Sequence, residues 1–386
     1  MLALGWIWQW SQWVIHLPEL ADLNGIAGSL PGMAQGESPD LTVVVPACNE
    51  EKSIELTLRT LLASTGLRLE IVAVDDRSTD RTGALMDRIA EEAAGKLSNH
   101  RLRVLHIAEL PHGWLGKPHA LATAAHTASA EWILFTDGDV RFAPDALALA
   151  LRYARAERAD HVVLMPDWLM GSPGEAAMHG AIHALSAWTL RLWRVADPKA
   201  RDFLGVGAFN LVRRSAYEEL GGFSALRMEV LEDLRFGWRL KRAGYRQRVA
   251  LGPGLAAVRW ADSAWGVVLN LEKNLFALYR YKTPLALMAA LGLLAQIVWP
   301  MLAIAAGGWA RVAGVVTYGA ISALYFASRK VTRVPPAYVL VFPLAAGLFL
   351  FAVLRSMVLA LARGGVVWRG TLYSLKELRA AAGEFW

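Results

Sequence analysis

Residues 41–76 read LTVVVPACNEEKSIELTLRTLLASTGLRLEIVAVDD. This segment holds two short apolar runs, 41–46 and 69–76, which are typical of buried strands. The stretch between them predicts a helix from Glu50 to about Leu62, with Asn49 as its cap. A strand, a helix and a second strand in this order are the unit of a parallel sheet, so the segment indicates an α/β fold.

The same alternation continues downstream. Ser78 is expected to cap a helix that runs to about Ala93. Further strands are expected at 102–107, 131–139 and 161–165, and further helices from Pro118 to about Ala128 and from Pro144 onward. The sequence therefore predicts a mainly parallel sheet with helices on both faces, in which ligands bind at the carboxyl ends of the strands.

The distribution of apolar residues indicates a second, membrane-bound part. The hydrophobic fraction is 55% and the mean hydropathy is +0.32, and the excess lies in 285–362. Polar breaks divide this region into 285–307, 312–328 and 337–362, which predicts two to three membrane spans. The opening segment is short for a span but rich in tryptophan, and it predicts a helix in the headgroup layer. Its tryptophans are Trp6, Trp8, Trp10 and Trp13.

The basic residues around these segments set a topological problem. Arg329, Lys330 and Arg333 are expected in the cytoplasm, because basic loops favour that side of a membrane. Three full spans after a cytoplasmic α/β domain would leave the basic tail from Arg363 on the outside. Either one segment is re-entrant or the last stops spanning near Arg355, a charge that is costly at mid-bilayer.

The net charge of +6 fits attraction to anionic lipid headgroups. A nucleic-acid partner is not expected, because no basic stripe with interleaved aromatic residues is present. The single cysteine, Cys48, excludes an intrachain disulfide and a zinc site built from cysteines.

Four regions are expected along the chain. They are an N-terminal interfacial helix and linker (1–40), a catalytic domain (41–283), transmembrane helices (284–364) and a cytoplasmic or interfacial tail (365–386). Within 41–283, two amphipathic helices, 174–195 and 265–281, are expected at the membrane surface.

The strongest local motif is FTDGDV, at the end of the expected strand 131–139. Asp137 and Asp139 place two carboxylates near one point, and the glycine between them lets a phosphate approach closely. Mg²⁺ and Mn²⁺ prefer oxygen ligands and leave coordination positions for substrate phosphates. The motif therefore predicts a Mn²⁺ or Mg²⁺ site.

Six motifs in order resemble the family-2 glycosyltransferases with the GT-A fold, a Rossmann-like α/β fold. They are VVVPACNEE, VDDRSTDRT, GWLGKPHAL, FTDGD, GAFNLVRRSAYEELGGF and LEDLRFGWRLKRAG, and they cover roughly 41–283. GWLGKPHAL and LNLEKNLFALYRY are most similar to the membrane-bound group that includes ceramide glucosyltransferase-like and hopanoid- or carotenoid-associated enzymes.

The resemblance implies a role for each matching position. The aspartate pair Asp137 and Asp139 is implied to bind the metal and the donor diphosphate, and Asp233 is implied as the catalytic base with Glu232 in support. The remaining residues implied to hold the nucleotide sugar are Pro46, Glu50, Asp75, Asp76 and Lys117. Charge separation in glycosyl transfer requires such groups, because negative charge develops on the leaving diphosphate and the acceptor must lose a proton.

The expected reaction is therefore a single displacement with inversion, which moves one sugar from a nucleotide sugar, UDP-glucose by default, to a lipid-like acceptor. The Gln-x-x-Arg-Trp motif of processive family members is not found between 240 and 283, which argues against polymer growth. The protein is expected in the inner (plasma) membrane as a multi-pass protein whose catalytic domain faces the cytoplasm. Two alternatives stay open: a transferase that builds or primes a polysaccharide, and a membrane protein that binds nucleotide sugar without catalysis.

Overall fold

A computed structural model describes residues 1–33, 38–95 and 99–382 of the chain. These residues form two compact units, and each unit is discontinuous in sequence. The sheet unit contains Leu20–Asp167 and Leu192–Val258, and the helical unit contains Met1–Glu19, Trp168–Arg191 and residues 259–382.

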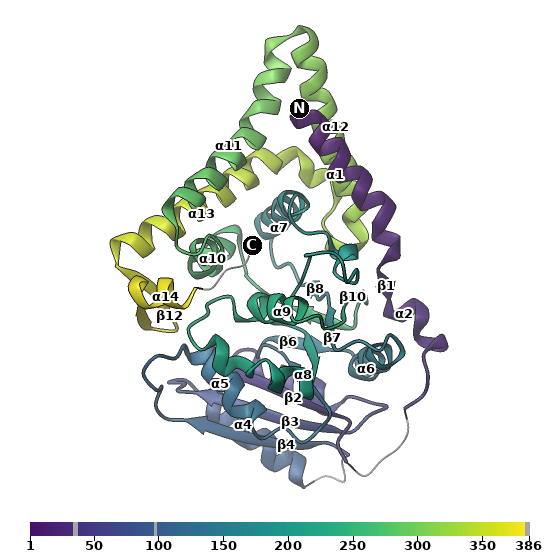
Figure 1. Cartoon of the computed structure of the whole chain (residues 1–386), viewed down its shortest axis with the longest axis vertical. Coiled ribbons are helices and arrows are strands. Elements are labelled where there is room, and N and C mark those ends of the chain that lie inside the picture. Colours follow the sequence, from purple (N-terminus) through teal and green to yellow (C-terminus); the bar gives the residue numbers. More distant parts are fainter. Residues whose placement is uncertain (34–37, 96–98, 383–386) are drawn as a thin grey trace. The chain divides into compact units, whose positions relative to one another are not determined.

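An eight-stranded sheet is the centre of the sheet unit (Figure 1). In spatial order its strands are β1 (Ala21–Asp22), β10 (Gln247–Leu251), β7 (His161–Leu164), β9 (Asn210–Arg213), β5 (Trp132–Phe135), β2 (Leu41–Ala47), β3 (Leu69–Asp76) and β4 (Arg101–Ile107). Neighbouring strands are parallel except for β9, which is antiparallel to β5 and β7. The predicted mainly parallel sheet is confirmed.

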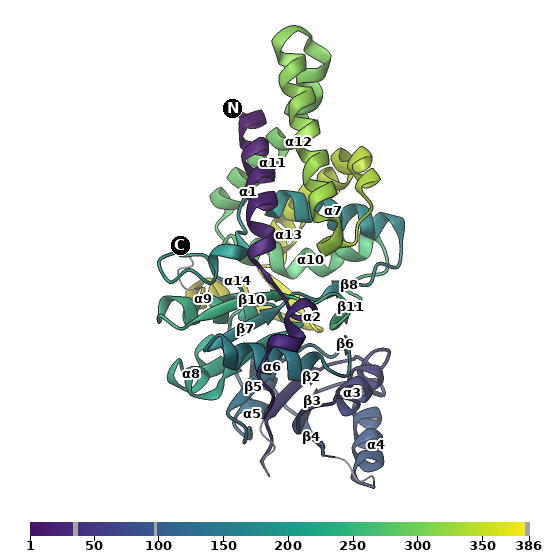
Figure 2. The same cartoon turned by 90° about the vertical axis from the view of Figure 1, so that its right-hand side faces the viewer.

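The helices of the sheet unit pack on this sheet. Their bounds are α2 (Leu23–Ile26), α3 (Ile54–Leu62), α4 (Thr82–Ala94), α5 (Gly116–Ala125), α6 (Ala146–Ala156), α8 (Arg214–Glu219) and α9 (Glu232–Arg242), with short 3-10 turns η2 (Ala27–Ser29), η3 (Leu192–Arg194) and η4 (Gly222–Leu226). Figure 2 shows α3 and α4 side by side. A buried cluster joins α5, α8 and α9 to the sheet through Phe135, Phe223 and Phe236.

Two loops at the carboxyl edge of the sheet are bonded to each other, which corrects two expected helix caps. The Asn49 side chain accepts a hydrogen bond from Thr79 N at 2.8 Å, and Ser78 Oγ accepts one from Asn49 N at 3.1 Å. Neither residue caps a helix, and α3 and α4 begin only at Ile54 and Thr82. The short polar side chains bond across the two loops instead, so the ends of β2 and β3 are held together.

The expected strand 131–139 is two strands. Strand β5 stops at Phe135, and Thr136 Oγ1 donates to Ala208 O at 2.8 Å. Strand β6 (Val140–Phe142) pairs with β11 (Ala256–Val258) in another sheet. The Asp-Gly-Asp motif therefore lies in the connection between two sheets. Helix α5 begins two residues earlier than expected, which places Lys117 in its first turn.

The expected linker 20–40 is partly ordered structure. Ala21 and Asp22 form β1, which pairs with β10 and extends the sheet. Helix α2 and η2 follow, and the Arg152 guanidinium donates to the carbonyls of Ala27 and Pro31. The segment is therefore held against the sheet unit by strand pairing and by the hydrogen bonds from Arg152. Residues 34–37 lie outside the described residues.

The helical unit contains three helices that are long and apolar enough to cross a membrane. Its elements are α1 (Leu2–His16), η1 (Leu17–Glu19), α7 (Pro173–Ser186), α10 (Ala264–Leu278), α11 (Thr283–Ala306), α12 (Gly308–Thr332), η5 (Pro336–Val341), α13 (Phe342–Ala362), β12 (Gly365–Trp368), β13 (Thr371–Ser374) and α14 (Leu375–Ala381). β8 (Asp167–Trp168) lies where the chain passes between the units. Helix α7 ends at Ser186 and is therefore shorter than the expected 174–195.

Polar side chains join α10 to α13 within this unit. Glu272 on α10 forms ion pairs with Arg355 and with Arg363, the latter at 2.7 Å. Ser356 Oγ donates to Glu272 O at 2.5 Å and accepts a hydrogen bond from Phe276 N at 2.9 Å. Glu272 O and Phe276 N are four residues apart in α10, so the hydroxyl bridges a donor and an acceptor that would otherwise bond directly within the helix. Aromatic contacts join α1 to the residues that follow α7, with the rings of Trp6 and Trp188 edge to face at 5.3 Å.

The first prediction concerns His106 on β4. Hydrogen bonds to Asp75 and Asp87, both at 3.0 Å, raise the pKa of His106 in the folded protein. The hydrogen bonds of protonated His106 to Asp75 and Asp87 therefore add to the free energy of unfolding below the ordinary histidine pKa of about 6.5. This contribution is lost as pH rises through the pKa of His106 in the folded protein. Melting temperatures of the wild type and His106→Gln in detergent should differ most at acidic pH and converge at alkaline pH. An equal difference at every pH would contradict this.

Candidate active site

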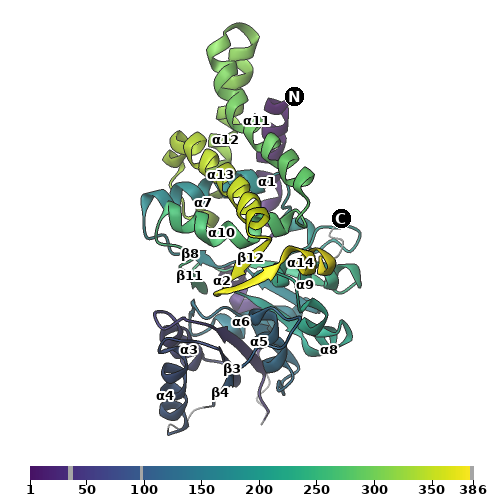
Figure 3. The ribbon, with the colours of Figure 1, turned by 90° about the vertical axis from the view of Figure 1, so that its left-hand side faces the viewer.

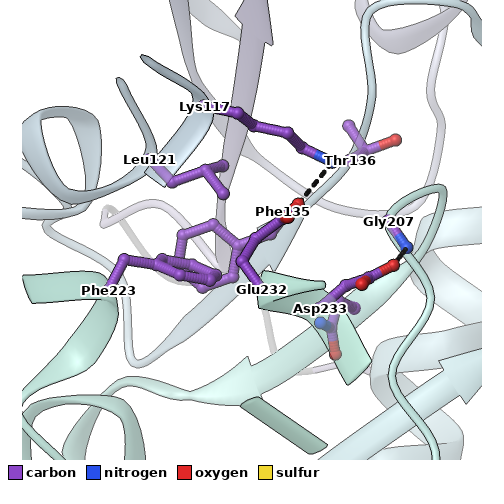
Figure 4. Close-up of a pocket in the computed structure, with 9 residues that line it drawn as sticks. Lys117, Leu121, Phe135, Thr136, Gly207, Phe223, Glu232 and Asp233 are labelled. Carbon is purple, nitrogen blue, oxygen red and sulfur yellow. Dashed lines mark hydrogen bonds and ion pairs between the residues drawn. The ribbon is translucent and has the colours of Figure 1, made fainter. Parts of the chain in front are cut away.

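Lys117 lies at the centre of a group of carboxylates at the carboxyl edge of the sheet. Lys117 comes from the first turn of α5, and its Nζ is 2.7 Å from Asp137 Oδ1. It is also 2.6 Å from Glu232 Oε1 (Figure 4). Asp137 follows β5 and Glu232 begins α9. The Lys117 and Glu232 side chains are 13% and 4% exposed, so the ion pair is largely shielded from water. One ammonium therefore joins three separate segments of the chain.

The charge balance at this point favours a protonated lysine. Burial by itself lowers the pKa of Lys117, but Asp137, Glu232 and Asp233 outweigh it and hold the pKa above its ordinary value. A buried ion pair is retained only where charges and hydrogen bonds are well matched. The group holds more carboxylates than ammonium ions, so it is suited to receive further positive charge.

The loop 204–209 brings backbone donors to Asp233. Because β9 is antiparallel to its neighbours, the loop that precedes it lies at the edge where the parallel strands end. Gly207 N donates to Asp233 Oδ2 at 2.7 Å (Figure 4). Leu234 N, in α9 itself, donates to Asp233 Oδ1 at 2.7 Å. Burial, followed by the charge of Glu232, raises the pKa of Asp233 to about 6. Asp233 is therefore a carboxylate at neutral pH, and each oxygen retains a lone pair.

Backbone-to-backbone packing holds α9 against this loop. An ideal Cβ on Gly205 would lie 1.8 Å from Asp233 O, and one on Gly237 would lie 2.1 Å from Leu204 O. Only glycine permits such an approach. A Cβ on Gly207 would lie 2.6 Å from Asp137 Oδ2, so this residue also borders the carboxylate group.

Asp139 completes the acidic edge. Burial, followed by the charges of Asp137 and Glu50, raises the pKa of Asp139 to about 7. Within the described residues no cluster of three or more histidine, cysteine or acidic side chains could hold a metal ion. Asp137 and Asp139 nevertheless fit Mg²⁺ or Mn²⁺, which are bound through one or two carboxylates with substrate phosphates and water.

A second part of the site lies at the end of β3. Arg77 has a left-handed backbone (φ 57), and its side chain turns back onto Asp76, with Nε 2.8 Å from Oδ1 and Nη2 3.2 Å from Oδ2. An ideal Cβ on Gly116 would lie 2.4 Å from Asp76 Oδ2. Gly116 therefore packs against the Asp76–Arg77 pair, while the next residue, Lys117, bonds to Asp137 and Glu232. The Gly-Lys sequence connects the two parts.

The structure brings most of the expected site residues to this edge, but not all of them. Pro46 lies in β2, and Glu50 follows it, with its N–H bonded to Thr82 Oγ1 at 2.8 Å. The Asp75 side chain bonds to His106 on β4 and to Ser78 N, and is separate from the Lys117 group. Successive residues of a strand point to opposite faces, and of this pair it is Asp76 whose carboxylate lies beside Gly116 and Arg77.

Sequence reasoning missed three contributors: Arg77, the ion pair between Lys117 and Glu232, and the Gly207 N–H. The pattern Gly-Val-Gly at 205–207 was a signal for the last of these, because paired glycines mark a close backbone approach. No local signal indicates the other two.

The glycine contacts lead to the second prediction. Gly205→Ala should displace α9, since its Cβ would meet a backbone oxygen that cannot rotate away. We expect a loss near the upper end of the about 1–3 kcal/mol typical of overpacking, measured by thermal unfolding. Gly28→Ala is the matched control, because nothing lies within 4 Å of its ideal Cβ. Equal melting temperatures for the two variants would contradict the close packing.

Comparison with known proteins agrees with this geometry. The model of the family described as "Glycosyl transferase family 2" matches residues 42–221. A 4,4'-diaponeurosporenoate glycosyltransferase of Staphylococcus haemolyticus is 22% identical over 239 residues, which are 61% of this chain and 61% of the relative. The succinoglycan biosynthesis protein ExoO of Rhizobium meliloti is 30% identical over 125 residues, 32% of each chain. The chain thus aligns with less than two thirds of these relatives' lengths.

A solved structure has the same fold. The mannosyltransferase PcManGT of Pyrobaculum calidifontis, in complex with GDP-Man and Mn²⁺, superposes with a TM-score of 0.50 at 23% identity, over 91% of this chain and 94% of that one. The expected GT-A fold and the family resemblance drawn from the six motifs are both confirmed. Residues 42–221 therefore match a glycosyltransferase domain of family 2.

Proposed function

We propose that the protein transfers a single sugar from a nucleotide sugar to a lipid-like acceptor at a membrane, with inversion and with the help of a divalent cation. UDP-glucose is the proposed donor, and GDP-mannose is the alternative raised by the solved neighbour in complex with GDP-Man. The observation that supports this most directly is the position of Lys117. It contacts the motif expected to hold the donor diphosphate and also the acidic pair expected to supply the base.

Departure of the nucleoside diphosphate requires positive charge. Lys117 is protonated and lies beside Asp137, where it is placed to stabilise the charge that develops on the leaving group. A divalent cation held by Asp137, Asp139 and the diphosphate would neutralise further charge there. Asp76 and Arg77, beyond Gly116, lie at the end of the site where the nucleoside is proposed to bind.

Removal of the acceptor proton is assigned to Asp233. Glu232 lies 2.6 Å from the Lys117 ammonium, so its Oε1 is already engaged in a charge-assisted ion pair. The hydrogen bonds that Asp233 accepts within the described chain come from backbone N–H groups, which orient it and leave lone pairs available. A pKa of about 6 suits a base that works at neutral pH. Glu232 is proposed to position Lys117.

The presence of this base bears on the acceptor atom. The relative from Staphylococcus haemolyticus is named for a carboxylate, which has no proton to lose at neutral pH. A hydroxyl acceptor does need a base, and the orientation of Asp233 favours that acceptor here. The two classes of product differ in chemistry, since mild alkali hydrolyses a sugar ester and leaves a glycoside intact.

The helical unit supports a membrane location for the acceptor. Three of its helices have the length and composition of membrane spans. The proposed location is the inner membrane, with the catalytic domain on the cytoplasmic side, where nucleotide sugars are available to it.

The donor and the product can be identified together. Membranes that contain the protein would be incubated with labelled UDP-glucose, UDP-GlcNAc, UDP-galactose or GDP-mannose and a total lipid extract. The proposal predicts a labelled lipid of fixed size that survives mild alkali. A product whose length grows with time would show a polysaccharide synthase, and the absence of any labelled product with every donor would contradict the proposal.

The third prediction concerns the metal. Activity should require Mn²⁺ or Mg²⁺, and Asp139→Asn should abolish turnover of the nucleotide sugar, because one of two protein carboxylates for the ion is lost. Asp145→Asn is the control, since Asp145 is exposed and makes no capping bond at the start of α6. Full activity in EDTA, or an active Asp139→Asn variant, would exclude the proposed metal site.

The fourth prediction concerns the base. Asp233→Asn should lower turnover by at least about 100-fold, the usual contribution of a positioned base, while donor affinity changes little. The side-chain amide retains one oxygen for the two N–H groups that now bond Asp233, so unfolding should be measured alongside. Glu232→Gln should be milder. If Asp233→Asn stayed active while Glu232→Gln were inactive, the two roles would be reversed, and two active variants would place the base elsewhere.

A further inference from the structure

Helices α11 and α12 form an antiparallel hairpin in the helical unit. They meet at Gly307 and Gly308, both with positive φ, so the chain reverses within two residues. Near this turn an ideal Cβ on Gly314 would lie 2.8 Å from Pro300 O, which shows how closely the helices pack. The start of α11 at Thr283 and the end of α12 at Thr332 therefore both lie at the open end of the hairpin, far from the turn (Figure 1), and this end is called its base.

Helix α13 starts in the half of the hairpin nearest this base. The rings of Phe342, its first residue, and Tyr325 are edge to face with centroids 6.5 Å apart. Tyr325 precedes the last residue of α12 by seven positions, which is about 10 Å along a helix axis. The start of α13 is thus about 10 Å above the base, within the depth of one leaflet of about 15 Å.

Helix α13 also ends at the base. Arg363, the residue after it, pairs with Glu272 of α10 at 2.7 Å, and α10 ends only a few residues before α11 begins. Farther along, the Arg379 guanidinium of α14 donates to Tyr281 O at 3.3 and 3.2 Å. Both ends of α13 consequently lie on the side where α11 starts and α12 ends, whereas a helix that crosses a bilayer has its ends on opposite sides.

The side chains of α13 agree with a position in one leaflet. One face is apolar and exposed at heptad spacing, through Leu344 (77%), Phe351 (46%) and Val358 (54%). The opposite face packs against neighbouring helices and includes Ser356, which bonds to the backbone of α10. Arg355 is paired with Glu272, also on α10, so its charge does not stand alone in hydrocarbon. Figure 3 shows α13 lying obliquely over α10.

We propose that α13 does not cross the membrane, although its hydropathy is the highest of the three candidates. It lies obliquely among the acyl chains of one leaflet, and α11 and α12 are the two crossing helices of the described chain. This arrangement places basic residues at the base of the hairpin, where anionic headgroups attract them. They are Lys282, Arg329, Lys330, Arg333, Arg363 and Arg379. The proposal rests on the membrane location given under the proposed function and is independent of catalysis.

Single cysteines test the topology. Cys48 is the only cysteine of the chain, so Cys48→Ala provides the background. Three exposed positions are then replaced one at a time: Trp309→Cys at the turn of the hairpin, Lys330→Cys near its base and Lys376→Cys in α14. A membrane-impermeant maleimide is applied to intact spheroplasts and to inverted membrane vesicles, and the labelled fraction of each variant is measured.

We expect Trp309→Cys to be labelled from one side only, and Lys330→Cys and Lys376→Cys from the other side only. Labelling of Lys376→Cys on the same side as Trp309→Cys would show three crossings and overturn the proposal. Labelling of all three from one side would show no crossing hairpin and overturn it as well. Neither readout depends on sugar transfer, so a failure of the proposed function in the lipid assay is a separate result.

Discussion

A buried ammonium paired with carboxylates from two distant segments is the interaction on which this site depends. Lys117 Nζ is held by Asp137 and Glu232, which stand far apart in sequence, and neither the lysine nor Glu232 has much access to water. Removing one partner from such a pair leaves a buried charge uncompensated, which costs about 3–5 kcal/mol. The end of β5, the first turn of α5 and the start of α9 must therefore keep their relative positions for this pair to persist.

The rest of the sheet unit provides those positions. Parallel strands bring the ends of β2, β3 and β5 to one edge, and the antiparallel β9 brings its preceding loop to the same edge. Gly205 lets that loop touch the α9 backbone, which sets the direction of Asp233. Gly116 brings α5 against Asp76. The residues proposed to bind the donor and the proposed base are thus placed on two sides of Lys117 by backbone packing.

Local pattern was sufficient for the strand–helix alternation, the mainly parallel sheet and the position of Asp137 at a strand end. Local pattern was insufficient where contacts between residues far apart in sequence determine which partner a side chain bonds. Asn49 and Ser78 have the chemistry of helix caps, yet they bond to each other's loops because the strand ends are adjacent. The alternation of side chains along a strand already predicts opposite faces for Asp75 and Asp76, so their separation follows from sequence alone. The role of Glu232 could not be read from sequence, because its partner precedes it by more than a hundred residues.

The most direct test of this account is the single-turnover rate of sugar transfer by Lys117→Met, measured with saturating donor and with folding verified by thermal unfolding. The account predicts a folded protein with greatly slowed transfer, because the leaving diphosphate loses its ammonium and Glu232 and Asp137 are left facing each other without a cation between them. A folded Lys117→Met variant that transfers sugar at the wild-type rate would contradict the account.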